Sequence, residues 1–167
     1  VVQNNSWGKA DSAQIISSLN TRKSHPYANS NGEAYSAIMG EGTAANWDAY
    51  ALALNSFQSS GVIVRAAGND STQSEVGGMA EMPLFYDFLD EAWLNVGNLV
   101  VNGSDATSAT VTRLGNPCGQ TAPFCIFADG YGITSSTGSV IGYHTYDGSS
   151  MAAPIVSGGI ALLAEAF

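Results

Sequence analysis

Apolar side chains recur every three or four residues between Ala44 and Gln58. They are Trp47, Tyr50, Ala51, Leu54 and Phe57, and this spacing places them on one face of a helix. Gly61 ends that pattern, and the run Val-Ile-Val at residues 62–64 predicts a buried strand of a parallel sheet. A helix followed by a short apolar strand is typical of an α/β domain.

The rest of the chain continues this alternation. Further strands are predicted at residues 1–5, 94–101 and 124–128, and further helices at residues 10–19 and 150–167. The pattern favours a three-layer α/β sandwich with a mainly parallel sheet, formed by one domain that spans residues 1–167. Because the chain opens within a strand-like run and ends directly after an apolar helix, we expect the fold to be incomplete at both ends.

Polar and glycine-containing stretches separate these elements. Residues 71–78 predict a loop, and residues 20–42 predict an excursion on the surface. Two glycines, Gly158 and Gly159, fall inside the last helix, where they would weaken an isolated helix. We therefore expect that helix to pack closely against the sheet at these positions.

Composition and charge narrow the classes of function. Of 167 residues, 45% are hydrophobic and only 11% are charged, which indicates a packed domain and not a disordered chain. The net charge is −9, and the five basic residues form no patch beyond one adjacent pair, which argues against nucleic acid as a partner. No uninterrupted apolar run approaches the roughly 18–20 residues of a membrane helix, so we predict no membrane contact by this segment. No metal-ligand cluster or cofactor motif is recognised.

Three polar residues follow predicted strands or open the last helix. In a parallel sheet the carboxyl ends of the strands share one edge, so Ser6, Asn69 and the turn before Ser150 are expected to meet there. Gly148 delivers Ser150 to the first turn of an apolar helix, where free amides and the helix dipole favour a developing negative charge. Pro154 falls where such a helix is expected to tolerate a missing N–H. Ordinary alternatives remain open, namely a helix N-cap for Ser150 and a simple turn for Asn69.

The sequence around these residues resembles a known family. Residues 148–154 read Gly-Ser-Ser-Met-Ala-Ala-Pro, similar to the serine motif Gly-Thr-Ser-Met-Ala-x-Pro of subtilisin-like serine proteases. Residues 66–69, Ala-Ala-Gly-Asn, and residues 5–8, Asn-Ser-Trp-Gly, resemble two further segments of that family, in the family's order.

The resemblance implies a role for each of these segments. Ser150 would be the nucleophile, and the side-chain amide of Asn69 would bind the oxyanion together with the backbone N–H of Ser150. Backbone pairing with an extended protein or peptide substrate would involve Ser6, Trp7 and Gly8. The wall of the primary specificity pocket would be formed by Ala66, Ala67 and Gly68.

Two cysteines, Cys118 and Cys125, are close enough in sequence to form a disulfide, although two free buried thiols fit the composition equally well. The segments around them resemble the cysteine pair of bacterial autotransporter members of the subtilisin-like family, and this resemblance favours a disulfide. It also implies a secreted or bacterial cell-surface protein.

The chain departs from the family in several places. Ser149 replaces the usual threonine, and residues 9–43 read as a surface insertion. The family's catalytic Asp and His precede the segment at residues 5–8, so this chain begins too late to contain them. Neither His25 nor His144 is assigned as the general base, and we expect the chain alone to be nearly inactive. The missing N-terminal part of the same domain is therefore an expected partner.

Two other functions fit parts of the same pattern. One is a protease-like binding or adhesion module that has lost its catalytic groups. The other is a serine esterase, although that class requires Gly-x-Ser-x-Gly, and Ala152 stands at the last position.

Overall fold

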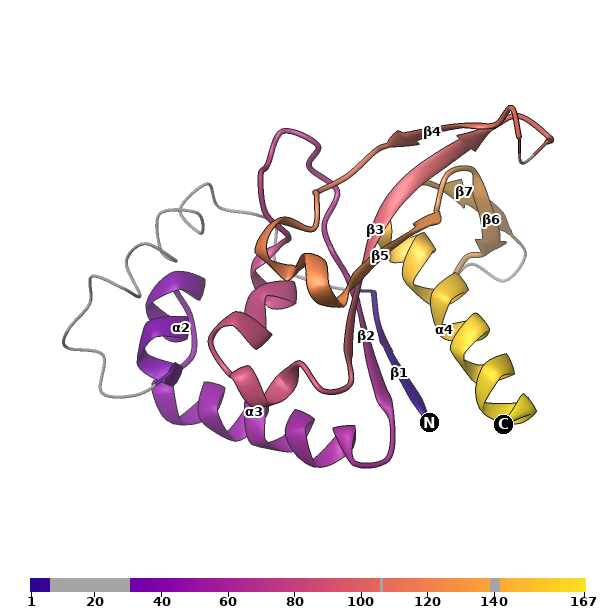
Figure 1. Ribbon diagram of the computed structural model, residues 1–167. Helices are drawn as coiled ribbons and strands as arrows, with labels where there is room; N and C mark the ends of the chain where they lie inside the picture. The colour runs from indigo at the N-terminus through magenta and orange to yellow at the C-terminus, as the bar shows by residue number, and fades with distance from the viewer. Residues whose placement is uncertain (7–30, 106, 139–141) are drawn as a thin grey trace.

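The computed structural model describes residues 1–6, 31–105, 107–138 and 142–167 (Figure 1). Within these ranges the chain forms a five-stranded sheet flanked by helices and a separate two-stranded sheet. The predicted α/β class with a mainly parallel sheet is therefore confirmed. The helix predicted at residues 10–19 lies outside the described residues, and so do Trp7, Gly8 and His25.

Parallel strands run side by side through the centre of the molecule. They are β1 (Val2–Asn5), β2 (Val62–Ala66), β3 (Trp93–Asn102) and β5 (Cys125–Asp129). Their order is β1-β2-β3-β5, with β1 at one edge, so their carboxyl ends lie along the same side of the sheet. The short strand β4 (Thr110–Arg113) returns antiparallel along the last residues of β3.

Helices cover both faces of this sheet (Figure 1). Helices α2 (Asn31–Met39) and α3 (Ala44–Gln58) lie on one side, and α4 (Ser149–Ala166) lies on the other. Successive side chains of β2 point to opposite faces of the sheet. Ile63 packs with Trp93 in an aromatic-rich core on one face, and Val64 packs with Ala152 and Ala153 on the other. The three layers expected from the sequence are thus present.

The described part of residues 20–42 differs from the predicted surface excursion. It forms α2, and Tyr35 and Met39 are buried in the core. The Tyr35 hydroxyl donates to the carbonyl oxygen of Gly78 over 2.7 Å, and burial raises the pKa of this hydroxyl well above its usual value. This prediction was wrong because one narrow apolar face was hidden among polar residues and glycines. The insertion at residues 9–43 stays a prediction.

Several short elements were not predicted from the sequence. They are the 3₁₀ helices η1 (Gly78–Leu84), η2 (Asp87–Leu89) and η3 (Gly119–Phe124) and the hairpin strands β6 (Ile133–Ser136) and β7 (Tyr143–Tyr146). The loop predicted at residues 71–78 is confirmed up to the start of η1. The β6–β7 hairpin ends only three residues before α4, so it leads the chain directly into the last helix.

Helix α4 departs from the expectations in two details. Pro154 is the sixth residue of the helix, so it cannot donate to the carbonyl oxygen of Ser150, four residues earlier. A Cβ atom at Gly158 or Gly159 would meet nothing within 4 Å, so the expected close packing there is wrong.

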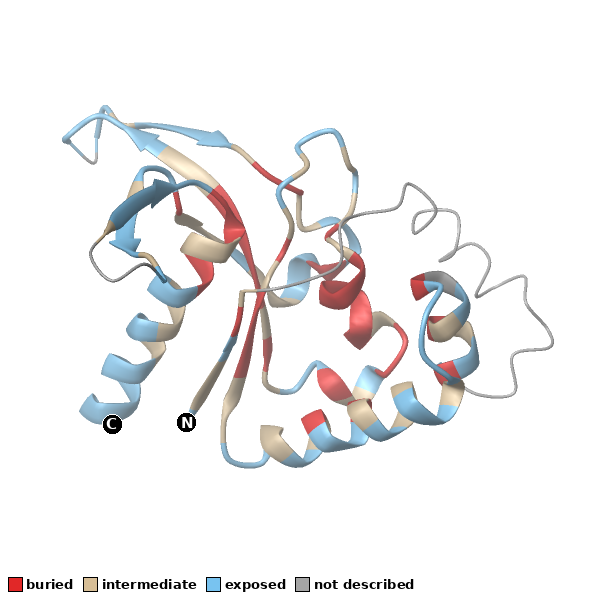
Figure 2. Ribbon diagram, turned by 180° about the vertical axis from the view of Figure 1, so that it is seen from behind, coloured by how far each residue is buried: buried red, intermediate tan, exposed pale blue. Residues whose placement is uncertain are grey.

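Much of helix α4 beyond its first turns is exposed (Figure 2). By length and composition alone, α4 is also sufficiently apolar to span a membrane, a property that the search for uninterrupted apolar runs did not reveal.

Replacing Gly159 by alanine should stabilise the chain. The new methyl group meets open space, and alanine lowers the conformational entropy of the unfolded state by restricting its backbone. We expect the free energy of unfolding to rise by about 0.5–1 kcal/mol, measured by urea denaturation. Gly130→Ala is the matched control, since its Cβ would lie 2.7 Å from Asn98 Oδ1 and 2.8 Å from the Ala152 nitrogen, and it should destabilise. Equal effects of the two substitutions would contradict this reasoning.

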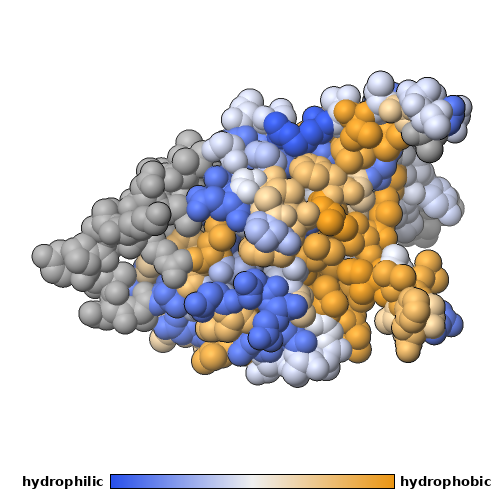
Figure 3. Space-filling model, viewed as in Figure 1, coloured by the Kyte–Doolittle hydropathy of each residue, from blue (hydrophilic) through white to orange (hydrophobic). Residues whose placement is uncertain are grey.

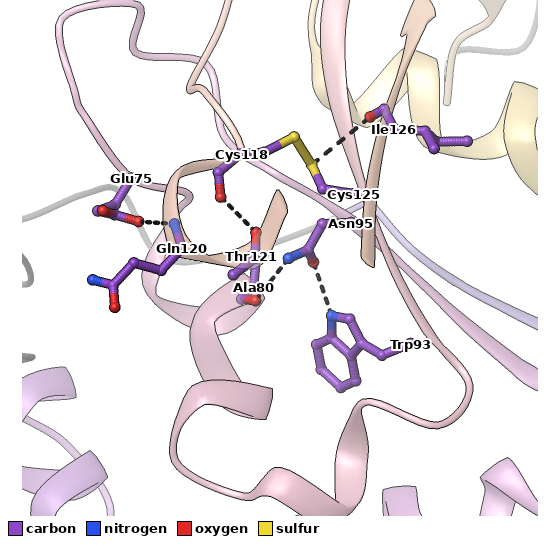
Figure 4. The surroundings of a disulfide bond; sticks show 9 residues. All are labelled: Glu75, Ala80, Trp93, Asn95, Cys118, Gln120, Thr121, Cys125 and Ile126. Atoms are coloured by element: carbon purple, nitrogen blue, oxygen red, sulfur yellow. Dashed lines mark hydrogen bonds between the residues drawn. A yellow bond between two sulfur atoms is a disulfide. The ribbon is translucent and has the colours of Figure 1, made fainter. Parts of the chain in front are cut away.

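Cys118 and Cys125 form a disulfide, with their Cα atoms 5.9 Å apart (Figure 4). The bridge closes a loop that contains η3, in which Thr121 is buried and bonds back to the Cys118 carbonyl oxygen through its N–H and its hydroxyl. The backbone N–H of Gln120 donates to the Glu75 carboxylate over 2.8 Å. The bridged loop is therefore tied to the segment that follows Asn69.

Candidate active site

The carboxyl edge of the sheet brings together the residues predicted to act. Ser6 directly follows β1, Asn69 lies three residues beyond β2, and Ser150 lies in the first turn of α4. The Ser150 hydroxyl donates to the Ser6 carbonyl oxygen over 2.7 Å, although the two residues are 144 positions apart in sequence. The predicted convergence at this edge is present in the structure.

Ser150 is the second residue of α4 and not its N-cap. The N-cap is Gly148, which is buried and has a φ of 146°, a conformation that favours glycine. Within the described ranges, the backbone N–H of Ser150 has no acceptor. It is one of the amides that a helix leaves free at its N-terminus, where the positive end of the helix dipole also lies. The ordinary N-cap alternative for Ser150 is therefore excluded.

Asn69 faces the same turn with a defined orientation of its side-chain amide. Its Oδ1 accepts a hydrogen bond from the Ser149 backbone N–H over 2.8 Å and another from the Ser149 hydroxyl over 2.9 Å. Because these donors engage Oδ1, the Nδ2 group points away from them, and it has no acceptor in the described part of the chain. Asn69 itself is exposed. The site thus presents two unengaged N–H donors, Asn69 Nδ2 and the Ser150 amide, beside a serine hydroxyl.

Ser149 joins the two loops of the site, a role that the sequence did not indicate. Its side chain is 1% exposed, and its Oγ accepts from the Gly68 N–H over 3.1 Å while donating to Asn69. The sequence showed only that a hydroxyl is retained where the family usually has threonine. A Cβ atom on Gly148 would approach Asn69 Oδ1 to 3.0 Å, so glycine leaves room for the amide.

A second buried asparagine supports the turn before Ser150. Asn98, 2% exposed on β3, accepts the N–H of Gly130 over 3.0 Å, and the carbonyl oxygen of Gly130 accepts the N–H of Gly148 over 3.0 Å. This chain of bonds links the sheet to the N-terminus of α4. The sequence does offer a signal for Asn98, namely a carboxamide in the middle of an apolar strand. A buried polar group of this kind needs hydrogen-bond partners.

The residue after Asn69 is held in its own turn. The Asp70 carboxylate accepts from the hydroxyl and backbone N–H of Thr72 and from the Gln73 side chain, and these bonds lower the pKa of Asp70. These hydrogen bonds favour the charged form of Asp70 and help to define the loop that carries Asn69.

A family model now identifies the chain. The model described as the subtilase family matches residues 1–167, the whole of the sequence. The chain belongs to the subtilase family.

Solved structures similar to this subtilase include two maturation proteases. The patellamide maturation protease PatG is 25% identical with a TM-score of 0.50, and the match covers 70% of this chain and 33% of that one. The prenylagaramide maturation protease PagA is 20% identical with a TM-score of 0.51, covering 94% of this chain and 51% of that one. The chain thus spans a third to a half of these relatives. No curated protein matches the chain.

The predicted pocket wall of the subtilase is only partly at the surface. Ala66 and Gly68 are half-buried, whereas Ala67 is fully buried and packs with Val76 and Ala80. The side chain of Ala67 therefore contributes to the core in this structure. Ser6 is half-buried at the end of β1, and Trp7 and Gly8 lie outside the described residues.

The structure gives no base beside the serine of this subtilase within the described ranges. His144 is exposed on β7, where its ring lies 5.3 Å from that of Tyr146, and the Ser150 hydroxyl is engaged by Ser6. Among the described residues there is no group of three or more His, Cys, Asp or Glu side chains that could hold a metal ion.

Proposed function

We propose that this chain supplies the nucleophile and the oxyanion hole of a serine endopeptidase. One observation carries the proposal, namely that Asn69 Oδ1 accepts both donors of Ser149, the residue before Ser150, and so leaves Nδ2 free to donate to an oxyanion. Two N–H donors next to a serine hydroxyl fit the tetrahedral intermediate of acyl transfer. Membership of the subtilase family supports a protease and not an esterase.

In the proposed reaction, Ser150 Oγ forms a bond to the carbonyl carbon of the scissile peptide bond. The hydroxyl proton passes to a histidine, which then gives it to the leaving amine as the C–N bond breaks. The resulting acyl-enzyme is hydrolysed by water, which restores the hydroxyl. Asn69 Nδ2 and the Ser150 amide bind the oxyanion that forms in both steps. The substrate is a protein or peptide that lies extended along the segment starting at Ser6, paired through its backbone.

The histidine and its aspartate partner are proposed to come from an upstream part of the same domain, so the chain alone is nearly inactive. The surface supports such a partner, because β1 is an edge strand among the described strands and apolar residues gather on the side where β1 and α4 lie (Figure 3). On α4, Leu162 and Leu163 are 70% and 60% exposed. An apolar surface of this kind beside an edge strand favours a covering segment.

We also propose that the protein is exported, as a secreted or bacterial cell-surface protease of the autotransporter type. The disulfide between Cys118 and Cys125 supports an oxidising compartment, since such bonds are rare in the cytosol. The low proportion of charged residues and the acidic balance are consistent with this location.

A fluorophosphonate probe, which forms an adduct with activated serines, tests the proposed function. The probe is applied to this chain and to a version extended upstream to include the proposed Asp and His, and the adduct is located by peptide mass. We expect an adduct on Ser150 only in the extended protein, because only there is a base available to take the hydroxyl proton.

Each other outcome changes the conclusion. An adduct on Ser150 in this chain alone would mean that His25 or His144 supplies the base and that an upstream histidine is not required. No adduct in either protein would favour the binding or adhesion module. An adduct with hydrolysis of esters but not of peptides would favour the esterase.

A further inference from the structure

Asn116 is a buried carboxamide next to the loop that carries Asn69. It lies three residues beyond β4, and its side chain is 0% exposed. A buried carboxamide has to satisfy both its carbonyl oxygen and its amide group, because burial without partners is costly. The partners of Asn116 therefore show which part of the chain it holds.

Three hydrogen bonds connect Asn116 to the segment Gly68–Glu75, near both of its ends. Its Oδ1 accepts from the Asp70 backbone N–H over 2.8 Å, and its Nδ2 donates to the Glu75 carbonyl oxygen over 2.7 Å. Its own backbone N–H donates to the Gly68 carbonyl oxygen over 3.2 Å. Two of these bonds join the residues immediately before and after Asn69.

Close packing at Gly68 restricts the same segment. Gly68 has a φ of 116°, and a Cβ atom there would overlap the Asn116 carboxamide. A Cβ atom on Gly115 would lie 2.5 Å from the Gly68 carbonyl oxygen. The two backbones approach each other so closely that only glycine fits at either position, which leaves the loop little room to shift relative to Asn116.

The loop closed by the Cys118–Cys125 disulfide also contacts the segment Gly68–Glu75. Cys118 is two residues beyond Asn116, and within the bridged loop Gln120 donates its N–H to the Glu75 carboxylate (Figure 4). Glu75 is therefore held through its carbonyl oxygen by Asn116 and through its side chain by the bridged loop.

From these contacts we propose that Asn116 is a positioning residue for the oxyanion hole, an inference that rests on the proposed function. It acts by fixing the backbone on both sides of Asn69, so that Nδ2 stays beside the Ser150 amide. An error of about 1 Å in such placement costs on the order of 100-fold in rate.

Two substitutions at Asn116 separate this role from general stability. Asn116→Ala removes the side-chain bonds with Asp70 and Glu75. Asn116→Asp keeps the size and the acceptor for Asp70 but cannot donate to Glu75 when ionised, and it remains informative if the alanine variant folds poorly. The matched control is Asn95→Ala, since Asn95 is also a fully buried asparagine with one accepted bond, from Trp93, and one donated bond, to Ala80.

The first readout is hydrogen exchange of the Asp70 amide in this chain, which needs no catalysis. We expect protection of this amide to fall in Asn116→Ala, and to persist in Asn116→Asp, which keeps its acceptor, and in Asn95→Ala. The second readout is turnover of a peptide by the extended protein, where kcat should fall about 100-fold in the Asn116 variants with KM unchanged. The control should keep its kcat even though it is less stable.

Unchanged Asp70 protection in Asn116→Ala, or a kcat of either Asn116 variant equal to that of Asn95→Ala, would overturn the inference. So would a rise in KM without a change in kcat, since that would mean that Asn116 acts on substrate binding. If the extended protein without substitutions shows no turnover, the proposed function fails, whereas the exchange result still decides whether Asn116 holds the loop.

Discussion

Ser150→Ala should lower peptide turnover by the extended protein about a millionfold, which is the loss known for subtilisin, another member of the family. The reason is chemical, because alanine has no oxygen to form the acyl-enzyme. KM should change little, since the Ser150 hydroxyl bonds to Ser6 in the free protein and makes no other side-chain bond to the described residues.

Ser157→Ala is the matched control for this substitution. Ser157 lies on the same helix, and its hydroxyl bonds back to the Ala153 carbonyl oxygen over 2.9 Å. The change removes the same atom from the same helix, so turnover should stay within about twofold of the unsubstituted protein if only local stability is affected. Retention of turnover by Ser150→Ala, with Ser157→Ala equally active, would show that another group is the nucleophile.

The long periodic elements could be predicted from the sequence because their pattern is locally determined. The helix at Ala44–Gln58 has the predicted bounds, and the strands at residues 62–64, 94–101 and 124–128 are each extended or shifted by one or two residues in the structure. In each case the apolar spacing alone specifies which face is buried.

Elements that depend on distant partners were missed. Tyr35 is buried because its hydroxyl donates to the Gly78 carbonyl oxygen and the ring of Trp47 packs edge-on 4.8 Å away. Neither contact can be predicted from the residues that neighbour Tyr35 in sequence. The β6–β7 hairpin is exposed on most of its residues, so it shows no apolar alternation. The packing expected at Gly158 and Gly159 was inferred from helix propensity, which says nothing about where a neighbour lies.

The candidate site was predicted in outline and not in its supporting bonds. The position of Ser6, Asn69 and Ser150 at one edge follows from strand direction, which the sequence pattern contains. The bonds that orient them come from Ser149, Asn98 and Asn116, and five of these bonds join residues that are 32 to 80 positions apart in sequence. Buried carboxamides in apolar or glycine-rich surroundings are the signal that a single sequence does offer.

Asn69→Asp should lower kcat of the extended protein about 100- to 1000-fold with KM unchanged, a range known from the oxyanion asparagine of subtilisin. The substitution is chosen because Oδ1 can still accept both bonds from Ser149, at 2.8 Å and 2.9 Å in the present structure, so the turn before Ser150 keeps its support. What changes is Nδ2, which becomes an oxygen that cannot donate to the oxyanion and repels it. Asn69→Ala removes the donor without adding charge, and it should give a loss of the same order.

The control for the added charge is Asn102→Asp, at the exposed end of β3, which should leave kcat unchanged. A second comparison uses the Ser150→Ala background, in which Asn69→Asp should cause little further loss, because no oxyanion forms on Ser150 there. If Asn69→Asp instead kept the full kcat, the outward amide would have no part in catalysis, and its orientation would serve only the turn at Ser149. A loss that remained equally large without Ser150 would point to damage of the fold, since two groups that act on one intermediate cannot contribute independently.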